Sequence, residues 1–187
     1  MKRNSEMKTP QKVLALSLAV AALTACGGSD KPTTPAPTAD TSPNLGAQIQ
    51  ALEASGQLPK LDRSTDIKGP DTDNNGIRDD IDAWIAVQPI TDEQKKAARQ
   101  MARAQQATLM ADLTDKAALD QLGDRTMRGV DCLADSFEPD YQKGLDLSNR
   151  IEAITANTKE RTKQYIAYNR AASGSVTELA PGNNCEP

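Results

Sequence analysis

The chain has no histidine among its 187 residues. This absence excludes catalytic triads and general bases that use imidazole, as well as the common zinc sites with histidine ligands. Aromatic residues are also scarce, with one Trp, one Phe and three Tyr. So few rings cannot form an evident stacking platform for nucleotide bases or sugars. The commonest catalytic constellations and base-stacking surfaces are therefore not expected.

The balance of charge argues against a nucleic-acid partner. Residues 1–25 contain four basic side chains and one acidic one, a net charge of +3, whereas the whole chain has a net charge of −4. The chain after residue 25 therefore carries a net charge of −7. Binding to nucleic acid requires Lys and Arg side chains that displace the counterions of the phosphates. We expect no nucleic-acid partner for an acidic protein of this kind.

Residues 1–25 have the organisation of a signal peptide. Basic residues precede an apolar run, Val13–Ala22, in which Ser17 is the only polar residue. A run of about ten residues is too short to span a bilayer core of about 30 Å, but it suits the apolar region of a signal peptide. The sequence therefore predicts export across the inner membrane.

The segment Leu23-Thr24-Ala25-Cys26-Gly27 closes this region. It resembles the lipobox of bacterial lipoproteins, in which the cysteine becomes the lipidated N-terminus after cleavage. The resemblance implies a lipid anchor on Cys26 that holds the protein to a membrane of the cell envelope. Gly27, in place of an aspartate, favours the outer membrane, with the domain facing the periplasm or the cell surface. The alternative is an ordinary secretory signal followed by an incidental cysteine.

Residues 26–44 are predicted to form a disordered tether. Four prolines lie there among Thr, Ser, Ala and Gly. Such a composition cannot bury enough apolar surface to offset the entropy lost on ordering. Residues 45–187 then remain, a length that suits one domain.

The apolar spacing of residues 45–187 is helical. Residues 45–55 form a first short amphipathic segment before Gly56, and a capping box at Thr91–Gln94 predicts a helix that runs to about Leu113. Thr114 and Asp115 are the next candidate N-cap. The apolar stripe of the following helix falls at spacings of three and four residues. It consists of Leu119, Leu122, Val130, Leu133 and Phe137.

Pro139 ends that helix, and one long helix is expected over about 140–171. Nothing alternates convincingly with period two, so the predicted fold class is all-α, a small helical bundle. We interpret the apolar stripes as core rather than as a cofactor pocket. A basic cluster is interpreted as a solvated face near a helix C-terminus. It comprises Lys159, Arg161, Lys163 and Arg170.

Residues 71–82, DTDNNGIRDDID, carry oxygen-bearing side chains at alternate positions and a glycine, Gly76, at the sixth position. Ca²⁺ binds six to eight oxygens at about 2.3–2.6 Å, and a tightly wrapped loop supplies them from such positions. The glycine permits the turn that aims the following carbonyl inward. The predicted calcium ligands are the side chains of Asp71, Asp73, Asn75, Asp79 and Asp82 and the carbonyl of Ile77.

The loop is similar to EF-hand and dockerin loops and closer to the thrombospondin type-3 repeats, which share the aliphatic at the seventh position and the paired aspartates that follow. It departs from the EF-hand in having Arg78 at the eighth position and the shorter Asp82 at the twelfth, and it occurs once rather than in tandem. These departures favour weak or water-completed coordination. The alternative is an acidic turn that caps a helix starting near Asp79, with no metal.

Residues 73–85, with Asn157-Thr-Lys-Glu-Arg and Tyr165-Ile-Ala-Tyr-Asn-Arg, also resemble a group of proteobacterial exported proteins, a likeness that implies no activity. Once Cys26 is lipidated, Cys132 and Cys185 remain. Two cysteines in an oxidising compartment predict one disulfide, with free buried thiols as the alternative.

These observations favour a non-enzymatic cell-envelope lipoprotein, in which a calcium-stabilised helical domain has a binding or scaffolding role towards a partner that the sequence does not identify. Two other functions stay open. A hydrolase could use paired carboxylates from residues 71–82, as glycosidases do. A calcium-dependent adhesion module would need an exposed apolar or aromatic patch.

Overall fold

The computed structural model describes residues 44–176 and 181–187. The predicted signal peptide, Cys26 and residues 26–43 of the predicted tether lie outside the described residues. The described residues belong to one compact unit that extends from residue 43 to the C-terminus. Among them, no helix is long and apolar enough to cross a membrane.

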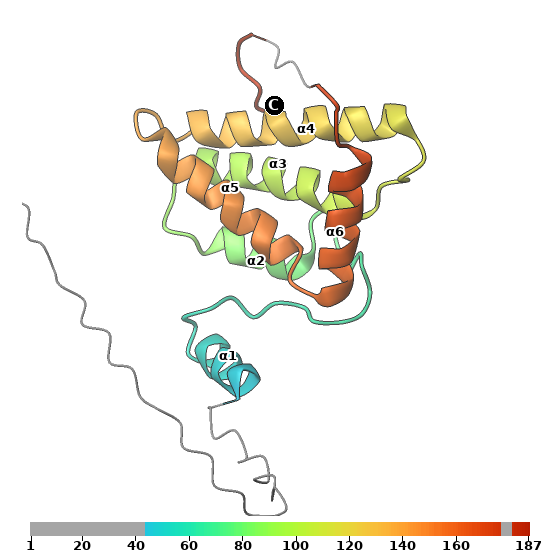
Figure 1. Cartoon of the computed structure of the whole chain (residues 1–187). Coiled ribbons are helices and arrows are strands. Elements are labelled where there is room, and N and C mark those ends of the chain that lie inside the picture. The colour runs from blue at the N-terminus through green and yellow to red at the C-terminus, as the bar shows by residue number, and fades with distance from the viewer. Residues whose placement is uncertain (1–43, 177–180) are drawn as a thin grey trace, which may run out of the picture. The chain divides into compact units, whose positions relative to one another are not determined.

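The predicted all-α fold is confirmed, because the described residues form α-helices and no strand (Figure 1). The helices are α1 (Leu45–Ala54), α2 (Asp79–Ala86), α3 (Asp92–Leu109), α4 (Lys116–Asp135), α5 (Tyr141–Thr155) and α6 (Lys159–Ala171). The short first helix, α1, begins at Leu45, as the apolar spacing predicts. None of its residues is buried, and Gly56 follows it with a positive φ of 73°.

Side-chain caps set the starts of the central helices. At α3 the predicted capping box forms, because Thr91 Oγ1 accepts from the Gln94 N–H and Gln94 Oε1 accepts from the Thr91 N–H. At α4, Asp115 accepts from the third N–H of the helix. Helix α3 ends at Leu109 rather than near Leu113. Asp112 accepts there from both the N–H and the hydroxyl of Thr114, a local turn that competes with further helix.

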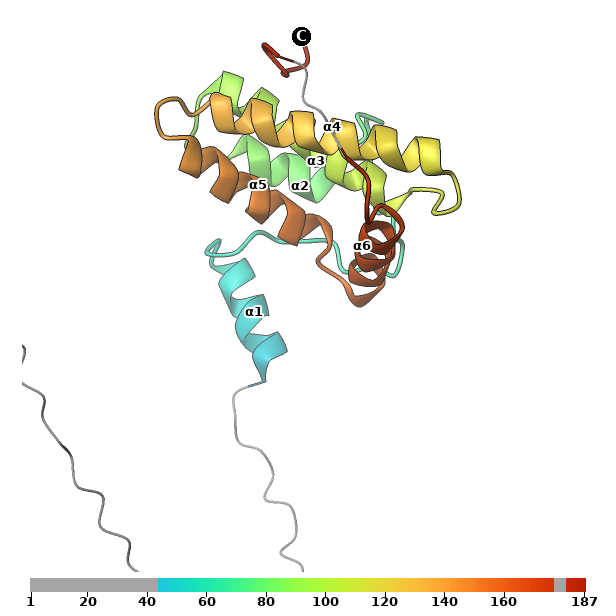
Figure 2. The same cartoon turned by 45° about the horizontal axis from the view of Figure 1, so that its top comes forward.

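The core lies around α3, which contacts α2, α4, α5 and α6 (Figures 1 and 2). Helices α3 and α4 run side by side in both views. The predicted stripe on α4 faces this core, with Leu119 and Leu133 buried. Glycine lets α5 approach α4 closely, since a Cβ at Gly144 would lie 2.4 Å from the Leu133 carbonyl oxygen.

The single long helix predicted over 140–171 is wrong, because α5 ends at Thr155 and α6 begins at Lys159. Arg78 binds the end of α5 at this break: its guanidinium donates to the carbonyls of Ile154, at 3.0 Å, and Thr155, at 3.3 Å. These are carbonyls that a continuing helix would use. Thr158 then caps the N-terminus of α6. A side chain from 76 residues earlier therefore helps to end α5.

Two arginines, Arg78 and Arg161, are fully buried, each with 0% of its surface exposed. Arg161 donates to the Asp62 carboxylate at 2.5 Å and to the carbonyls of Asp62 and Asp66, both at 2.8 Å. Arg78 donates to both carboxylate oxygens of Asp80, at 2.6 and 3.0 Å. The Asp62 N–H joins the two pairs by donating to Asp80 at 2.6 Å. We call Asp62, Arg78, Asp80 and Arg161 the arginine clamp.

The interpretation of Arg161 as part of a solvated face is wrong. Its neighbours Lys159 and Lys163 are exposed, but Arg161 lies on the side of α6 that meets residues 62–67. The close fit is visible at Gly69, whose φ is 67°. A Cβ there would lie 2.4 Å from Arg78 Cδ and 2.9 Å from an Arg161 terminal nitrogen, so only glycine lets the chain pass.

The C-terminal tail, residues 181–187, returns to α3 and α4. Cys185 forms a disulfide with Cys132 of α4, with 4.8 Å between the two Cα atoms. The Gln100 side chain also holds the tail, donating to the Asn184 carbonyl at 2.9 Å and accepting from the Glu186 N–H at 2.8 Å. The structure thus contains the disulfide that the cysteine count predicts.

Candidate functional site

The loop of residues 71–82 begins after Pro70 and runs into α2. Its entry and exit are tied together, because the Asp79 N–H donates to the Pro70 carbonyl at 2.8 Å. Two residues at its turn have positive φ, 55° at Asn74 and 82° at Gly76. A Cβ at Gly76 would make only ordinary contacts, so the backbone conformation and not crowding accounts for glycine there.

Three of the predicted ligands converge. Asp71, Asp73 and Asp79 each place one carboxylate oxygen within 4.8 Å of the others. Two oxygens that bind the same Ca²⁺ lie at most about 5 Å apart, since each is about 2.3–2.6 Å from the ion. The spacing of the three carboxylates is therefore compatible with one shared cation.

Asp71 is the most unusual of the three. Its side chain is 7% exposed, and its Oδ1 is buried without a hydrogen-bond partner. The nearest cation, Lys68 Nζ, lies 3.9 Å from the other oxygen, Oδ2. A buried carboxylate oxygen without a partner is costly, and such atoms in folded proteins call for an unseen water or ion. Asp71 therefore presents an acceptor that nothing in the described chain satisfies.

Asp79 is held as a carboxylate by the loop itself. The hydroxyl and the N–H of Thr72 donate to it at 2.7 and 2.8 Å. Hydrogen bonds to the ionised form hold the pKa of the Asp79 carboxyl below its usual value. Asp79 is consequently ionised at neutral pH and available to a cation.

The other three predicted ligands have different surroundings. Asn75 accepts from the Ile77 N–H at 2.8 Å and donates to Asp73 and Asp82. Asp82 accepts from Arg99 Nε at 2.6 Å and is not in the group of three carboxylates. The Ile77 side chain is buried in the core and anchors the loop, while the role of its carbonyl stays a prediction.

A cavity of about 350 Å³ lies between the loop and α3. The residue spacing of the loop did not predict it. We call it the α3 cavity. Three cationic side chains line it together with Asp71 and Gln106; they are Lys68, Arg103 and Arg125. The Gln106 side chain is buried and donates to the Lys68 carbonyl at 2.9 Å. Its Oε1 has no partner. No sequence signal singled out Gln106 among the many glutamines of α3.

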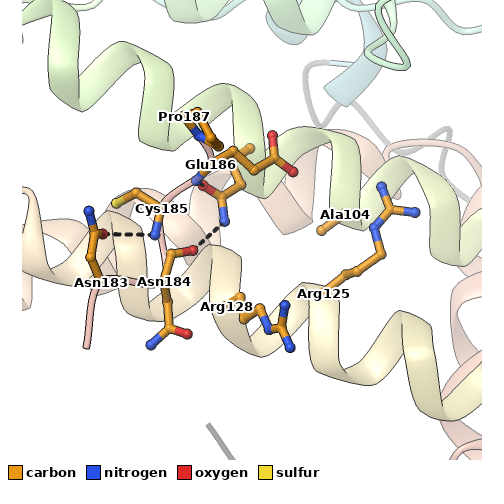
Figure 3. A pocket seen from close by; sticks show the side chains of 9 residues that line it. Ala104, Arg125, Arg128, Asn183, Asn184, Cys185, Glu186 and Pro187 are labelled. Atoms are coloured by element: carbon orange, nitrogen blue, oxygen red, sulfur yellow. Dashed lines mark hydrogen bonds between the residues drawn. The ribbon is translucent and has the colours of Figure 1, made fainter. Parts of the chain in front are cut away.

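A second hollow of about 350 Å³ lies along the tail (Figure 3). Arg125 and Arg128 of α4 line it with Asn183, Asn184 and Glu186. The arginines are exposed, and Glu186 forms an ion pair with Arg103. The tail thus covers part of α3, and the described residues that line this hollow offer no buried side-chain polar atom without a partner.

No family model, curated protein or solved structure matches the chain.

Proposed function

We propose that the helical domain binds Ca²⁺ in the loop of residues 71–82. The observation that carries the proposal is the convergence of Asp71, whose buried Oδ1 has no hydrogen-bond partner, with the carboxylates of Asp73 and Asp79. A bound cation would satisfy this oxygen and relieve the repulsion among three carboxylates that lie within 4.8 Å of one another.

The chemistry of the ligands favours calcium among the divalent cations. The candidate ligands are all oxygens, and neither histidine nor a cysteine lies in the loop. Oxygen ligands on an irregular loop suit Ca²⁺, which tolerates varied geometry, better than Mg²⁺, which demands a near-ideal octahedron. Zinc sites prefer nitrogen and sulfur ligands.

Calcium in this position has a structural effect. Ile77 lies inside the loop sequence and Ile81 on α2, and both are buried in the core. A cation that fixes the loop therefore fixes how α2 enters the core. We propose a non-enzymatic role on this basis: a calcium-stabilised domain that binds or scaffolds a partner in the cell envelope.

Calcium should raise the melting temperature of the wild-type chain by about 4–8 °C at about 2 mM. Modules of this kind outside the cytosol bind Ca²⁺ with dissociation constants of about 10⁻⁴–10⁻³ M. Taking about 10⁻⁴ M, linkage adds about 1.8 kcal/mol of stability, which corresponds to that shift for a domain of this size. Calorimetric titration and thermal melting, with EGTA as the reference state, measure both quantities.

Asp71→Asn should abolish most of the calcium shift, because it removes a charged oxygen but keeps the shape of the side chain. Asp135→Asn provides a matched control, since it makes the same change of charge at an exposed position of α4. If the wild-type chain shows neither heat nor a melting shift at millimolar calcium, the loop is an acidic helix cap and the proposal is wrong.

We also propose that Cys26 is acylated and anchors the protein to the envelope, on the strength of the lipobox after a short apolar run. Three acyl chains anchor firmly, since each buried CH₂ contributes about 0.8 kcal/mol. Metabolic labelling with a palmitate analogue should mark the wild type, and Cys26→Ala should lose the label and block processing by the lipoprotein signal peptidase. Release of an unlabelled wild-type protein into the soluble fraction would contradict the anchor.

A further inference from the structure

Two buried side-chain polar atoms in the described part of the chain have no hydrogen-bond partner, Asp71 Oδ1 and Gln106 Oε1. Both are oxygens, and both residues line the α3 cavity. They come from separate elements, the loop and α3. Buried polar groups in folded proteins are nearly always paired. Two orphaned acceptors on the wall of one cavity therefore point to a common occupant that is positively charged or donates hydrogen bonds.

The orientation of the Gln106 amide is determined by its neighbours. Its Nε2 donates to the Lys68 carbonyl at 2.9 Å. If the amide were flipped, Oε1 would face that carbonyl, and two acceptors would repel each other. The side chain is 6% exposed, so the amide has little freedom to turn to bulk water. Gln106 Oε1 is thus fixed as an acceptor without a partner.

Calcium needs more oxygens than the converging carboxylates bring together. Asp71, Asp73 and Asp79 contribute one oxygen each to the group, whereas Asp82 is bound to Arg99 and lies outside it. Ca²⁺ takes six to eight oxygens, so the remainder must come from water, from the loop backbone or from outside the loop. Gln106 is a side chain from outside the loop that lines the same cavity as Asp71.

We propose that Gln106 supplies its Oε1 to the cation bound at Asp71, either directly or through one water in the α3 cavity. This inference rests on the proposed calcium function and extends it. Since α3 is the central helix of the domain, a ligand on α3 ties the loop to the core directly. The metal would then add a second link between the loop region and α3, beside the hydrogen bond that Gln106 donates to the Lys68 carbonyl.

Calorimetric titration of the full-length chain in neutral detergent with CaCl₂ alone tests the inference. Gln106→Leu should weaken the affinity about 10- to 100-fold, the range expected when a supporting ligand of a metal is lost. Gln105→Leu is the matched control, because the adjacent glutamine is equally buried on α3 but does not line the cavity. The control should retain the wild-type affinity.

A second measurement uses the wild-type chain and does not depend on the folding of a variant. In a ¹⁵N NMR titration with CaCl₂, the side-chain amide of Gln106 should shift more than those of Gln105 and Gln100. If calcium binds and neither the affinity of Gln106→Leu nor the Gln106 amide resonance changes, the inference is overturned while the calcium proposal stands. If the wild-type chain does not bind calcium, both fail.

Discussion

Replacement of Asp62 by asparagine should lower the free energy of unfolding by about 2–3 kcal/mol, the cost of leaving a buried charged group without its partner when that partner is itself 21% exposed. The Arg161 guanidinium that Asp62 neutralises has no exposed surface. Asparagine keeps an oxygen for the hydrogen bond but removes the counter-charge. The backbone carbonyls of Asp62 and Asp66 still bind Arg161, yet they carry no net charge. Denaturant unfolding at neutral pH measures the loss.

Lys143→Ala is the control for this variant. It removes an ion pair with Asp140 in which the two side chains are 68% and 51% exposed. Exposed pairs contribute about 0–1 kcal/mol, so this variant should be nearly as stable as the wild type. Equal small losses in Asp62→Asn and Lys143→Ala would show that the clamp contributes no more than a surface pair.

The pH dependence of the free energy of unfolding tests the Asp62–Arg161 ion pair independently. Burial opposes ionisation of Asp62, but hydrogen bonds from Arg161 and Ser64 prevail and lower the pKa of its carboxyl to about 2. In the unfolded chain the pKa is near 3.8. A carboxyl whose pKa falls on folding stabilises the protein above about pH 4, and that contribution is lost as the pH falls towards 2. Asp62→Asn should lack this step.

Loss of the Cys132–Cys185 disulfide should cost about 4 kcal/mol in the chain-entropy model, because the bond closes a loop between residues 53 apart in the sequence. The double variant Cys132→Ala/Cys185→Ala should therefore melt at a markedly lower temperature. The bond also presents the tail to Gln100, whose side chain pairs with the backbone of residues 184 and 186. Reduction of the wild type should produce the same shift as the double variant.

Glu186→Gln separates the disulfide from the other contacts of the tail. It removes the ion pair with Arg103 but leaves the bond intact, and Glu186 is 49% exposed, so the change in stability should stay below about 1 kcal/mol. Thiol titration of the denatured, unreduced chain, followed by peptide mapping, should find neither Cys132 nor Cys185 free. If both thiols react and reduction leaves the melting temperature unchanged, the disulfide does not form.

Local features of the sequence determined the helix starts and the acidic loop. The Thr91 capping box, the Asp115 cap and the apolar spacing of α4 each depend on residues within a few positions of one another. The convergence of Asp71, Asp73 and Asp79 is local for the same reason, since Gly76 and the turn around it bring nearby carboxylates together. Interactions between residues close together in the sequence depend on local residue order, and they could be predicted from it.

The burial of charge and the completion of the site were decided only by the tertiary structure. The cluster of basic residues around Arg161 was interpreted as a solvated face, and no nearby residue indicated its partner Asp62, which lies 99 residues away. The same holds for Arg78, which donates to carbonyls at the end of α5, and for Gln106, which lines the α3 cavity together with Asp71. Whether a charged or amide side chain can be buried depends on the partner opposite it, and the packing of distant segments supplies that partner.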